Sequence, residues 1–265
     1  MREKRRVWPC CLTIAGSDSG GNAGVQADLR TFHAYRLHGC TVFTVLTAQN
    51  PNGVFAINEI AADFIAAQLD AILGVYSIAA LKTGMLGSAS VVEAVVDRLK
   101  SFSAIFKVID PVMVATSGAE LAGAATRKAM EKQLLPLATL ITPNIPEAKA
   151  LSGRAVESLE DIRDAAKCLY DKFGAAVLIK GGHQMRNLGK AEDILFDGSE
   201  YSSFSLSRIE NPISTHGTGC TLSAAIAAEL ALGRSLKDAV KGAKNYVYQA
   251  IMKSYLVGEN CGVLF

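Results

Sequence analysis

A ten-residue stretch near the end of the chain, Thr215–Ala224, combines residue types that could bind an anion and accept a proton. Glycines at 217 and 219 precede an Ala-rich apolar segment that predicts a helix, and the first N–H groups of a helix lack helical partners and carry partial positive charge. Such a terminus can bind phosphate. Cys220 lies in the first helical turn, where a thiol pKa is lowered and thiolate is favoured. A plain glycine-rich helix start with a small buried cysteine fits this stretch equally well.

Other polar residues follow predicted strands. The apolar run 11–15 leads into the glycine-rich loop 16–24 and then a helical pattern at 25–37, an order typical of a ligand-binding turn. Open α/β sheets bind ligands at such strand ends. Further residues in this position are Gln49 after strand 41–47, Met85 after 78–81, Asp110 after 106–109, Asn144 and Glu147 after 137–141, and Lys180 after 175–179.

Helical spacing of apolar residues alternates with these strands. Strand-like runs within 192–207 flank Asp197-Gly198, a strong hairpin signal. The small-residue loop 113–122 is expected to act as a flap. The alternation predicts an α/β fold with a mainly parallel sheet, helices on both faces and a late antiparallel hairpin. The predicted helices lie near 64–73, 89–100, 124–135, 158–173, 220–232 and 236–253. Ser158, with Asp161 three residues later, is a capping signal for the helix that ends before Gly174.

Composition limits the class of protein. The chain has 265 residues, half of them hydrophobic, without a linker-like segment, so we expect one domain over residues 1–265. A net charge of +2 gives no indication of nucleic acid binding. Residues 1–9 are predicted to be a flexible basic tail rather than a secretory signal, because the apolar part that follows is short and contains Pro9. No apolar run approaches the roughly 18 residues of a membrane span.

Cysteine usage and missing motifs exclude several further classes. Six cysteines without a C-x-x-C pair indicate neither a disulfide scaffold nor a zinc or redox dithiol motif, and they favour a reducing cytoplasm. The zincin, P-loop and dinucleotide-binding signatures are all absent from the sequence.

Seven motifs taken together are much more specific than any one of them. They are GSDSGGNAGVQADL, TAQNPNGV, LKTGML, DPVM, TPNIPEA, LIKGGH and THGTGCTLSAAIAA, in this order. With them the chain resembles, over residues 10–255, the hydroxymethylpyrimidine and phosphomethylpyrimidine kinases of thiamin synthesis, members of the ribokinase-like superfamily. The resemblance implies a ribokinase-like three-layer α/β sandwich. It also implies a cytoplasmic homodimer that uses ATP and Mg²⁺ to phosphorylate a hydroxymethylpyrimidine and then its monophosphate.

The resemblance also implies roles for individual residues. Cys220 would be the catalytic base, and Gly217, Thr218 and Gly219 would complete the anion hole. The pyrimidine would be lined by Ala23, Asp28, Gln49, Met85 and Val112; the nucleotide would contact Asn144, Lys180 and Thr215; and Asp110 and Glu147 would bind the metal.

Two departures and two alternatives remain. Asn22 stands where the family usually has glycine, which would either narrow the loop or occupy a left-handed turn. The tail 257–265 keeps only a trace of the usual Gly-x-Gly ending. A pyridoxal or pyridoxine kinase of the same superfamily is the nearest alternative. A non-catalytic pyrimidine-binding protein is disfavoured, because it would not need Asp110, Glu147 and Lys180.

Overall fold

The inner parallel strands of the central sheet are largely buried on both faces because helices cover both. The computed structural model describes residues 8–113, 122–181, 189–259 and 261–264. Within these residues nine strands form one sheet in the order β3-β2-β1-β4-β5-β6-β7-β8-β9. The strands are β1 (Cys10–Asp18), β2 (His38–Asn50), β3 (Gly53–Glu59), β4 (Ile78–Thr83), β5 (Phe106–Ile109), β6 (Leu140–Ile141), β7 (Ala176–Lys180), β8 (Lys190–Phe196) and β9 (Tyr201–Ser207).

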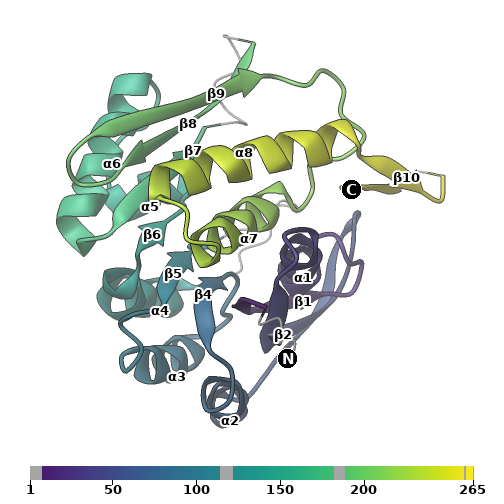
Figure 1. Ribbon diagram of the computed structural model, residues 1–265, viewed down its shortest axis with the longest axis vertical. Coiled ribbons are helices and arrows are strands. Elements are labelled where there is room, and N and C mark those ends of the chain that lie inside the picture. The colour runs from purple at the N-terminus through teal and green to yellow at the C-terminus, as the bar shows by residue number, and fades with distance from the viewer. Residues whose placement is uncertain (1–7, 114–121, 182–188, 260, 265) are drawn as a thin grey trace, which may run out of the picture.

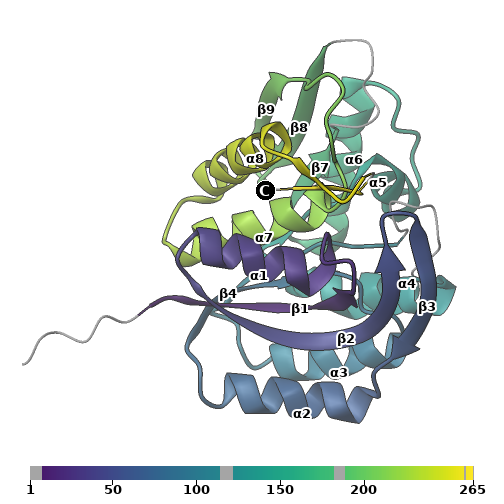
Figure 2. The same cartoon turned by 90° about the vertical axis from the view of Figure 1, so that its right-hand side faces the viewer.

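The six central strands, β2 to β7 in spatial order, pair in parallel, and both edges of the sheet are antiparallel. Figures 1 and 2 show helices packed on both faces of the sheet. One face carries α1 (Gly24–Ala34), α7 (Thr218–Ala231) and α8 (Leu236–Met252); the other carries α2 (Ala62–Leu73), α3 (Ala89–Leu99), α4 (Ala124–Ala129), α5 (Ile145–Ser152) and α6 (Leu159–Phe173). The predicted three-layer α/β fold is confirmed.

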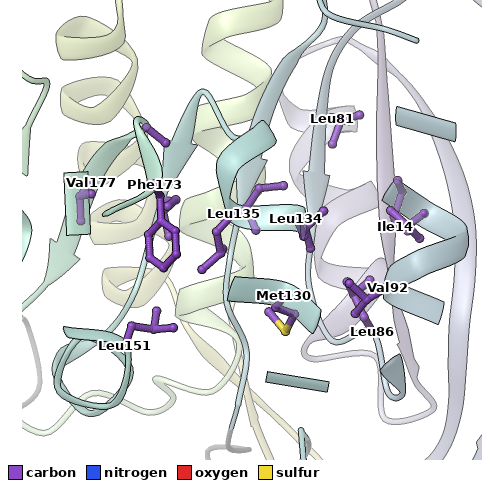
Figure 3. Close-up of a cluster of buried hydrophobic side chains, with 14 of the residues drawn as sticks. Ile14, Leu81, Leu86, Val92, Met130, Leu134, Leu135, Leu151, Phe173 and Val177 are labelled. Atoms are coloured by element: carbon purple, nitrogen blue, oxygen red, sulfur yellow. The ribbon is translucent and has the colours of Figure 1, made fainter. Parts of the chain in front are cut away.

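Each face of the sheet has its own hydrophobic core. Successive side chains of a strand point to opposite faces, so Leu12 and Ile14 of β1 join the core under α2 to α6, whereas Cys11 joins the core under α1, α7 and α8. Figure 3 shows the first core, where Ile14 and Phe173 are among the labelled side chains. Helix α7 is apolar almost all round and lies between the sheet and α8, so the loop before it is held by a rigid element.

Local signals are mostly confirmed. Ser158 and Asp161 form the predicted capping box of α6, which ends at Gly174 in the left-handed conformation (φ 68°). The hairpin between β8 and β9 turns at Asp197, whose Oδ1 accepts hydrogen bonds from the N–H groups of Ser199 and Glu200. Both features depend on contacts within a few residues of chain.

Three segments differ from the predictions. The helix expected at 124–135 changes after α4 to a π-helix, Met130–Leu134, and a 3-10 turn, Leu135–Leu137, because Pro136 has no N–H to continue an α-helix. Strand β2 continues to Asn50 and returns as β3, so the polar segment 48–53 is a hairpin rather than a loop. The tail forms a further hairpin, β10 (Tyr255–Val257) with β11 (Cys261–Val263).

Some predictions fall outside the described residues. They concern the basic tail over residues 1–7, the flap over 114–121, and His183 of the LIKGGH motif. Among the helices that are described, none combines the length and the apolar character needed to cross a membrane.

Candidate active site

A cavity of about 1010 Å³ lies at the carboxyl ends of the parallel strands. It brings together residues from β2, β4, β7, β8 and the starts of α1, α5 and α7. Its lining includes all the predicted site residues except one, namely Ala23, Gln49, Met85, Asp110, Val112, Asn144, Glu147, Lys180, Thr215, Gly217, Thr218, Gly219 and Cys220. The exception is Asp28, which does not reach the cavity.

Gly217 is required at the start of α7. It is the N-cap residue with φ 83°, and a Cβ built on it would collide with the carbonyl oxygen of Asn22. The loop before α7 therefore packs against the loop after β1. Asn22 is buried and does not adopt positive φ, whereas its neighbours Gly21 and Gly24 do. The left-handed alternative for Asn22 is thus wrong, and close packing under Gly217 accounts for its burial.

Gly217→Ala should lower kcat/KM by about tenfold to a hundredfold, because the added methyl group displaces the N–H groups at the start of α7. Steady-state kinetics checks this. Gly233→Ala is the matched control, since Gly233 has nearly the same φ, 81°, but a Cβ there meets no atom within 4 Å. The control should show only the cost of backbone strain. Equal activity in the two variants would contradict the close approach to Asn22.

Asp18 organises the loop after β1 and was missed by the sequence interpretation. Its carboxylate accepts hydrogen bonds from the N–H groups of Gly20 (2.8 Å), Asn22 (2.9 Å) and Ala23 (2.8 Å), and His216 Nε2 lies 3.8 Å away. Burial by itself would raise the pKa of Asp18, but His216 and these N–H groups hold it below its ordinary value. An aspartate followed by glycines is a signal for this type of turn and could have identified it.

Asp28 and Lys82 form a buried ion pair below the cavity. Lys82 Nζ lies 2.9 Å from Asp28 Oδ2, which also accepts a 2.6 Å hydrogen bond from Thr13 Oγ1. Both charged side chains are fully buried. Burial opposes the charge on Lys82, but Asp28 raises its pKa above the ordinary value. The expectation that Asp28 lines the cavity is wrong, because Asp28 lies on the inner face of α1; the pair presents Lys82 to the cavity instead.

Cys220 is the third residue of α7 and lines the cavity. Burial raises the pKa of its thiol, and the nearby Asp28 and Asp110 add to this, while Lys82 and a hydrogen bond from the Gly24 N–H act in the opposite direction. The predicted lowering of the thiol pKa by the helix terminus is therefore wrong. Burial has the largest effect on this pKa and favours the thiol form of Cys220.

Lys180 and Asp110 form an ion pair, with Lys180 Nζ 2.8 Å from Asp110 Oδ1. Burial lowers the pKa of Lys180, but Asp110 and Glu147 more than compensate and raise it above its ordinary value. The hydroxyl of Ser223, one turn after Cys220, lies 3.3 Å from the other oxygen of Asp110. The helix that carries Cys220 is thereby linked to the carboxylate that faces Lys180.

Glu147 and Asn144 form a capping box at the start of α5. Asn144 Oδ1 accepts from the Glu147 N–H at 2.9 Å, and Glu147 Oε2 accepts from the Asn144 N–H at 2.8 Å. The Glu147 side chain is almost fully buried, and burial raises its pKa to about 7 despite the attraction of Lys180. Glu147 therefore changes charge near neutral pH.

Asp193 and Lys244 form an ion pair where β8 and α8 line the cavity. Lys244 Nζ of α8 lies 2.6 Å from Asp193 Oδ2 of β8, and Asp193 Oδ1 accepts from the Gly181 N–H at 3.0 Å. This pair fixes the backbone directly after Lys180. Sequence reasoning missed it, since nothing local links residues 51 positions apart.

Gln49 lines the cavity, as do Met85 and Val112. Its backbone is fixed by Ser19, whose hydroxyl donates to the Gln49 carbonyl and accepts from the Gln49 N–H, both at 2.8 Å. Its side-chain oxygen accepts from Thr47 Oγ1 at 3.2 Å. The backbone thus holds the loop, and the amide group remains available at the cavity wall.

A cavity at the carboxyl edge of a mainly parallel sheet, lined by a helix N-terminus, Lys180 and the carboxylates of Asp110 and Glu147, fits a kinase of the ribokinase-like class. The phosphomethylpyrimidine kinase family model matches residues 18–264. The chain belongs to the phosphomethylpyrimidine kinase family, whose members are phosphotransferases.

Individual relatives agree with this family. The hydroxymethylpyrimidine/phosphomethylpyrimidine kinase of Haemophilus influenzae is 46% identical over 95% of this chain and 94% of its own length. The thiamine biosynthesis bifunctional protein ThiED of Geobacter sulfurreducens is 43% identical over 95% of this chain, which spans only about half (51%) of that protein.

Solved structures are similar over nearly the whole chain. Pyridoxal kinase of Bacillus subtilis, in an ADP complex, has a TM-score of 0.88 and 38% identity, with 97% of each chain covered. Phosphomethylpyrimidine kinase of Clostridium difficile has a TM-score of 0.81 and 37% identity, covering 92% of this chain and 99% of its own. Fold similarity therefore does not separate a pyrimidine kinase from a pyridoxal kinase, and only the site residues can.

Proposed function

We propose that this chain, as a single ribokinase-like domain over residues 1–265, transfers phosphate from ATP to 4-amino-5-hydroxymethyl-2-methylpyrimidine and then to its monophosphate, in thiamine biosynthesis. The names of the relatives support this activity. The observation that carries it is one continuous cavity across the carboxyl edge of the sheet, lined by Gln49 of β2 and Met85 after β4, by Lys180 of β7 and Asp193 of β8 further along the strand order, and by Gly217–Cys220. A hydroxyl and a terminal phosphate bound within this one cavity would meet at that loop.

The pyrimidine would bind against Ala23, Gln49, Met85 and Val112. An aminopyrimidine presents an N–H donor beside a ring-nitrogen acceptor, and an amide side chain can pair with both. Met85 and Val112 offer apolar contact to the ring and its methyl group. Asp28 would act indirectly, because its ion pair holds Lys82 at the cavity.

ATP would bind along Asn144, Lys180 and Thr215, with its terminal phosphate at the N–H groups of Gly217–Cys220. Asp110 and Glu147 are oxygen donors of the kind that Mg²⁺ takes, and their position beside Lys180 fits such an ion. Glu147 already accepts from backbone N–H groups, so contact through water suits it better than direct coordination. When bound, Mg²⁺ would supply positive charge around the transferring phosphate.

In the transfer, the substrate O–H bond breaks and a bond forms between that oxygen and the terminal phosphorus, while ADP leaves. Cys220 would take the proton. Its thiol must first become thiolate, and the positive charge of Lys82 favours that change. The start of α7 and Lys180 would stabilise negative charge on the migrating group, the main requirement of phosphoryl transfer.

Glu147→Gln should weaken the binding of Mg²⁺, seen as a higher Mg²⁺ concentration for half-maximal activity.

Glu147→Gln should also change the pH dependence of the free energy of unfolding. The folded-state pKa of Glu147 is raised to about 7, so the wild type loses stability as pH rises from about 4.5 to 7. The Glu147→Gln variant lacks this loss, so the pH-dependent change in the free energy of unfolding should differ between wild type and variant by at most about 3 kcal/mol. Urea unfolding at pH 5 and pH 8 measures it.

Glu157→Gln removes an exposed carboxylate and serves as the control. Parallel pH dependence in Glu147→Gln and wild type would contradict the raised pKa. An unchanged Mg²⁺ titration would remove Glu147 from the metal site.

Gln49→Leu should raise the KM for the pyrimidine by about 5- to 150-fold, the scale of a lost bidentate contact of about 1–3 kcal/mol, and leave any activity on pyridoxal nearly level. Pyridoxal has a hydroxyl at the comparable edge, so it pairs less well with the amide. Steady-state kinetics with both substrates measures the effect. Ser19→Ala is the control, because it releases the Gln49 backbone and keeps the amide. If both variants weakened both substrates equally, Gln49 would only fix the loop.

Pyridoxal kinase is the second candidate, favoured by the high TM-score of the Bacillus subtilis enzyme. ATP-coupled assays with hydroxymethylpyrimidine, its monophosphate and pyridoxal test the proposal. We expect the two pyrimidines to give the higher kcat/KM. A higher kcat/KM for pyridoxal would favour a pyridoxal kinase over the proposed function. If no phosphate were transferred to any of the three, the alternative of a non-catalytic pyrimidine-binding protein would be favoured.

We also propose a cytoplasmic homodimer that binds neither nucleic acid nor membrane. The outer strand β3 exposes Phe55 (67%) and Ile57 (49%), apolar side chains that a second copy could cover. Analytical ultracentrifugation of the wild type and Phe55→Ser tests this, with a monomeric wild type as the contrary result.

A further inference from the structure

Two cysteines and a histidine meet at the end of the sheet remote from the cavity. Cys10 begins β1, and His38 and Cys40 lie near the start of β2, where Cys10 is the register partner of His38. Side chains two residues apart in a strand share a face, so Cys40 lies on the same face as His38. The pairing of the two strands therefore brings all three side chains together, although 28 residues separate Cys10 from His38.

The three potential ligand atoms are close enough to share one ion. Cys10 Sγ and Cys40 Sγ are 3.5 Å apart, and the two sulfurs and a His38 nitrogen all lie within 4.8 Å of one another. Two thiolates on a tetrahedral zinc ion, at about 2.3 Å each, are about 3.8 Å apart. The His38 ring stacks on Tyr76, with centroids 5.5 Å apart and planes 15° from parallel, which restricts its orientation. Little movement would be needed to close the site.

We propose that Cys10, His38 and Cys40 bind one zinc-like divalent ion, with water in the fourth position. Thiolate and imidazole select zinc-like ions over the hard Mg²⁺ of the kinase reaction. On binding, two S–H bonds break and two protons leave to solvent, and the two thiolates neutralise the charge of the ion. Both cysteines are buried and His38 is exposed, so the ion would have a protein side and a solvent side.

The site would stabilise the fold rather than take part in catalysis. Strand β1 has nine residues from Cys10 to Asp18 at the cavity, and the eight steps between these two residues span about 26 Å at the usual rise per residue. An ion at its first residue would fasten the start of β1 to the start of β2. A cysteine must lose its proton to bind the ion, so binding should displace protons from both thiols and weaken as pH falls.

The test uses the reduced, metal-free full chain titrated with Co²⁺ and then with Zn²⁺. We expect one Co²⁺ per chain, sulfur-to-cobalt charge-transfer absorption, displacement by Zn²⁺, and release of about two protons. Saturating Zn²⁺ should raise Tm by about 5 °C or more and leave kcat unchanged. Cys10→Ser and Cys40→Ser should each lose most of the charge-transfer band. His38→Ala, at an exposed position, should keep the band and bind about tenfold more weakly or worse.

Cys168→Ser on α6 and Cys220→Ser are the controls, and both should bind Co²⁺ like the wild type. Loss of the band in Cys220→Ser would move the ion to the kinase cavity and overturn the proposal. Unchanged binding in both Cys10→Ser and His38→Ala would overturn it, as would a wild type that binds no ion while fully reduced. A disulfide between Cys10 and Cys40, found by mass as the loss of two hydrogens, would overturn it if reduction did not restore binding.

Discussion

Cys220→Ala is expected to lower kcat by about two to four orders of magnitude, the scale of a lost general base, and to leave ATP affinity nearly unchanged. The residue lines the cavity at the third position of α7, in the helical turn whose N–H groups are proposed to hold the transferring phosphate. The alanine variant keeps those N–H groups. Rapid-quench measurement of transfer and equilibrium titration of ATP separate the two effects.

The pH profile adds a second readout for Cys220. Burial raises the pKa of this thiol, so kcat in the wild type should keep rising with pH through and beyond the ordinary thiol range as thiolate forms. That rise should be absent in the alanine variant. Cys168→Ala on α6 is the control and should retain the wild-type profile. A Cys220→Ala enzyme with near wild-type turnover would reduce Cys220 to a packing residue.

Lys82→Met is expected to lower the free energy of unfolding by about 3–5 kcal/mol, because it leaves Asp28 buried without its partner. Asp28 and Lys82 have no exposed surface, and Lys82 Nζ contacts both carboxylate oxygens, at 3.0 and 2.9 Å. Burial already raises the pKa of Asp28, and removal of Lys82 raises it further. The loss of stability should therefore be larger at pH 8 than at pH 5, where Asp28 can bind a proton.

Denaturant unfolding measures this change, and a second substitution isolates the charge. Lys82→Met combined with Asp28→Asn should recover most of the loss, because asparagine keeps an acceptor for Thr13 and carries no charge. Arg98→Met breaks an exposed ion pair with Asp70 and is the control, with an expected loss of at most about 1 kcal/mol. Equal losses in the two single variants would mean that the buried pair is no more important than the exposed one.

Sequence patterns predicted the features that depend on neighbouring residues. The Ser158–Asp161 capping box, the turn at Asp197 and the start of α7 beyond Gly217 follow from hydrogen bonds and backbone angles within one turn of chain. The strand ends could be located because apolar runs stop where polar residues begin. Since parallel strands all point the same way, residues after those strands had to meet at one edge, and the cavity lies there.

The tertiary structure decided which of these residues reach the cavity and in what charge state. Asp28 is a buried partner of Lys82 rather than a cavity residue. Burial and the charges of Asp28 and Asp110, which come from distant segments, raise the pKa of the Cys220 thiol. The tertiary structure also brings together Asp193 with Lys244, 51 residues apart, and Cys10 with Cys40, 30 residues apart. Hydrogen bonds and turns are set by atoms a few residues apart, whereas desolvation and ion pairing depend on every segment packed around a group.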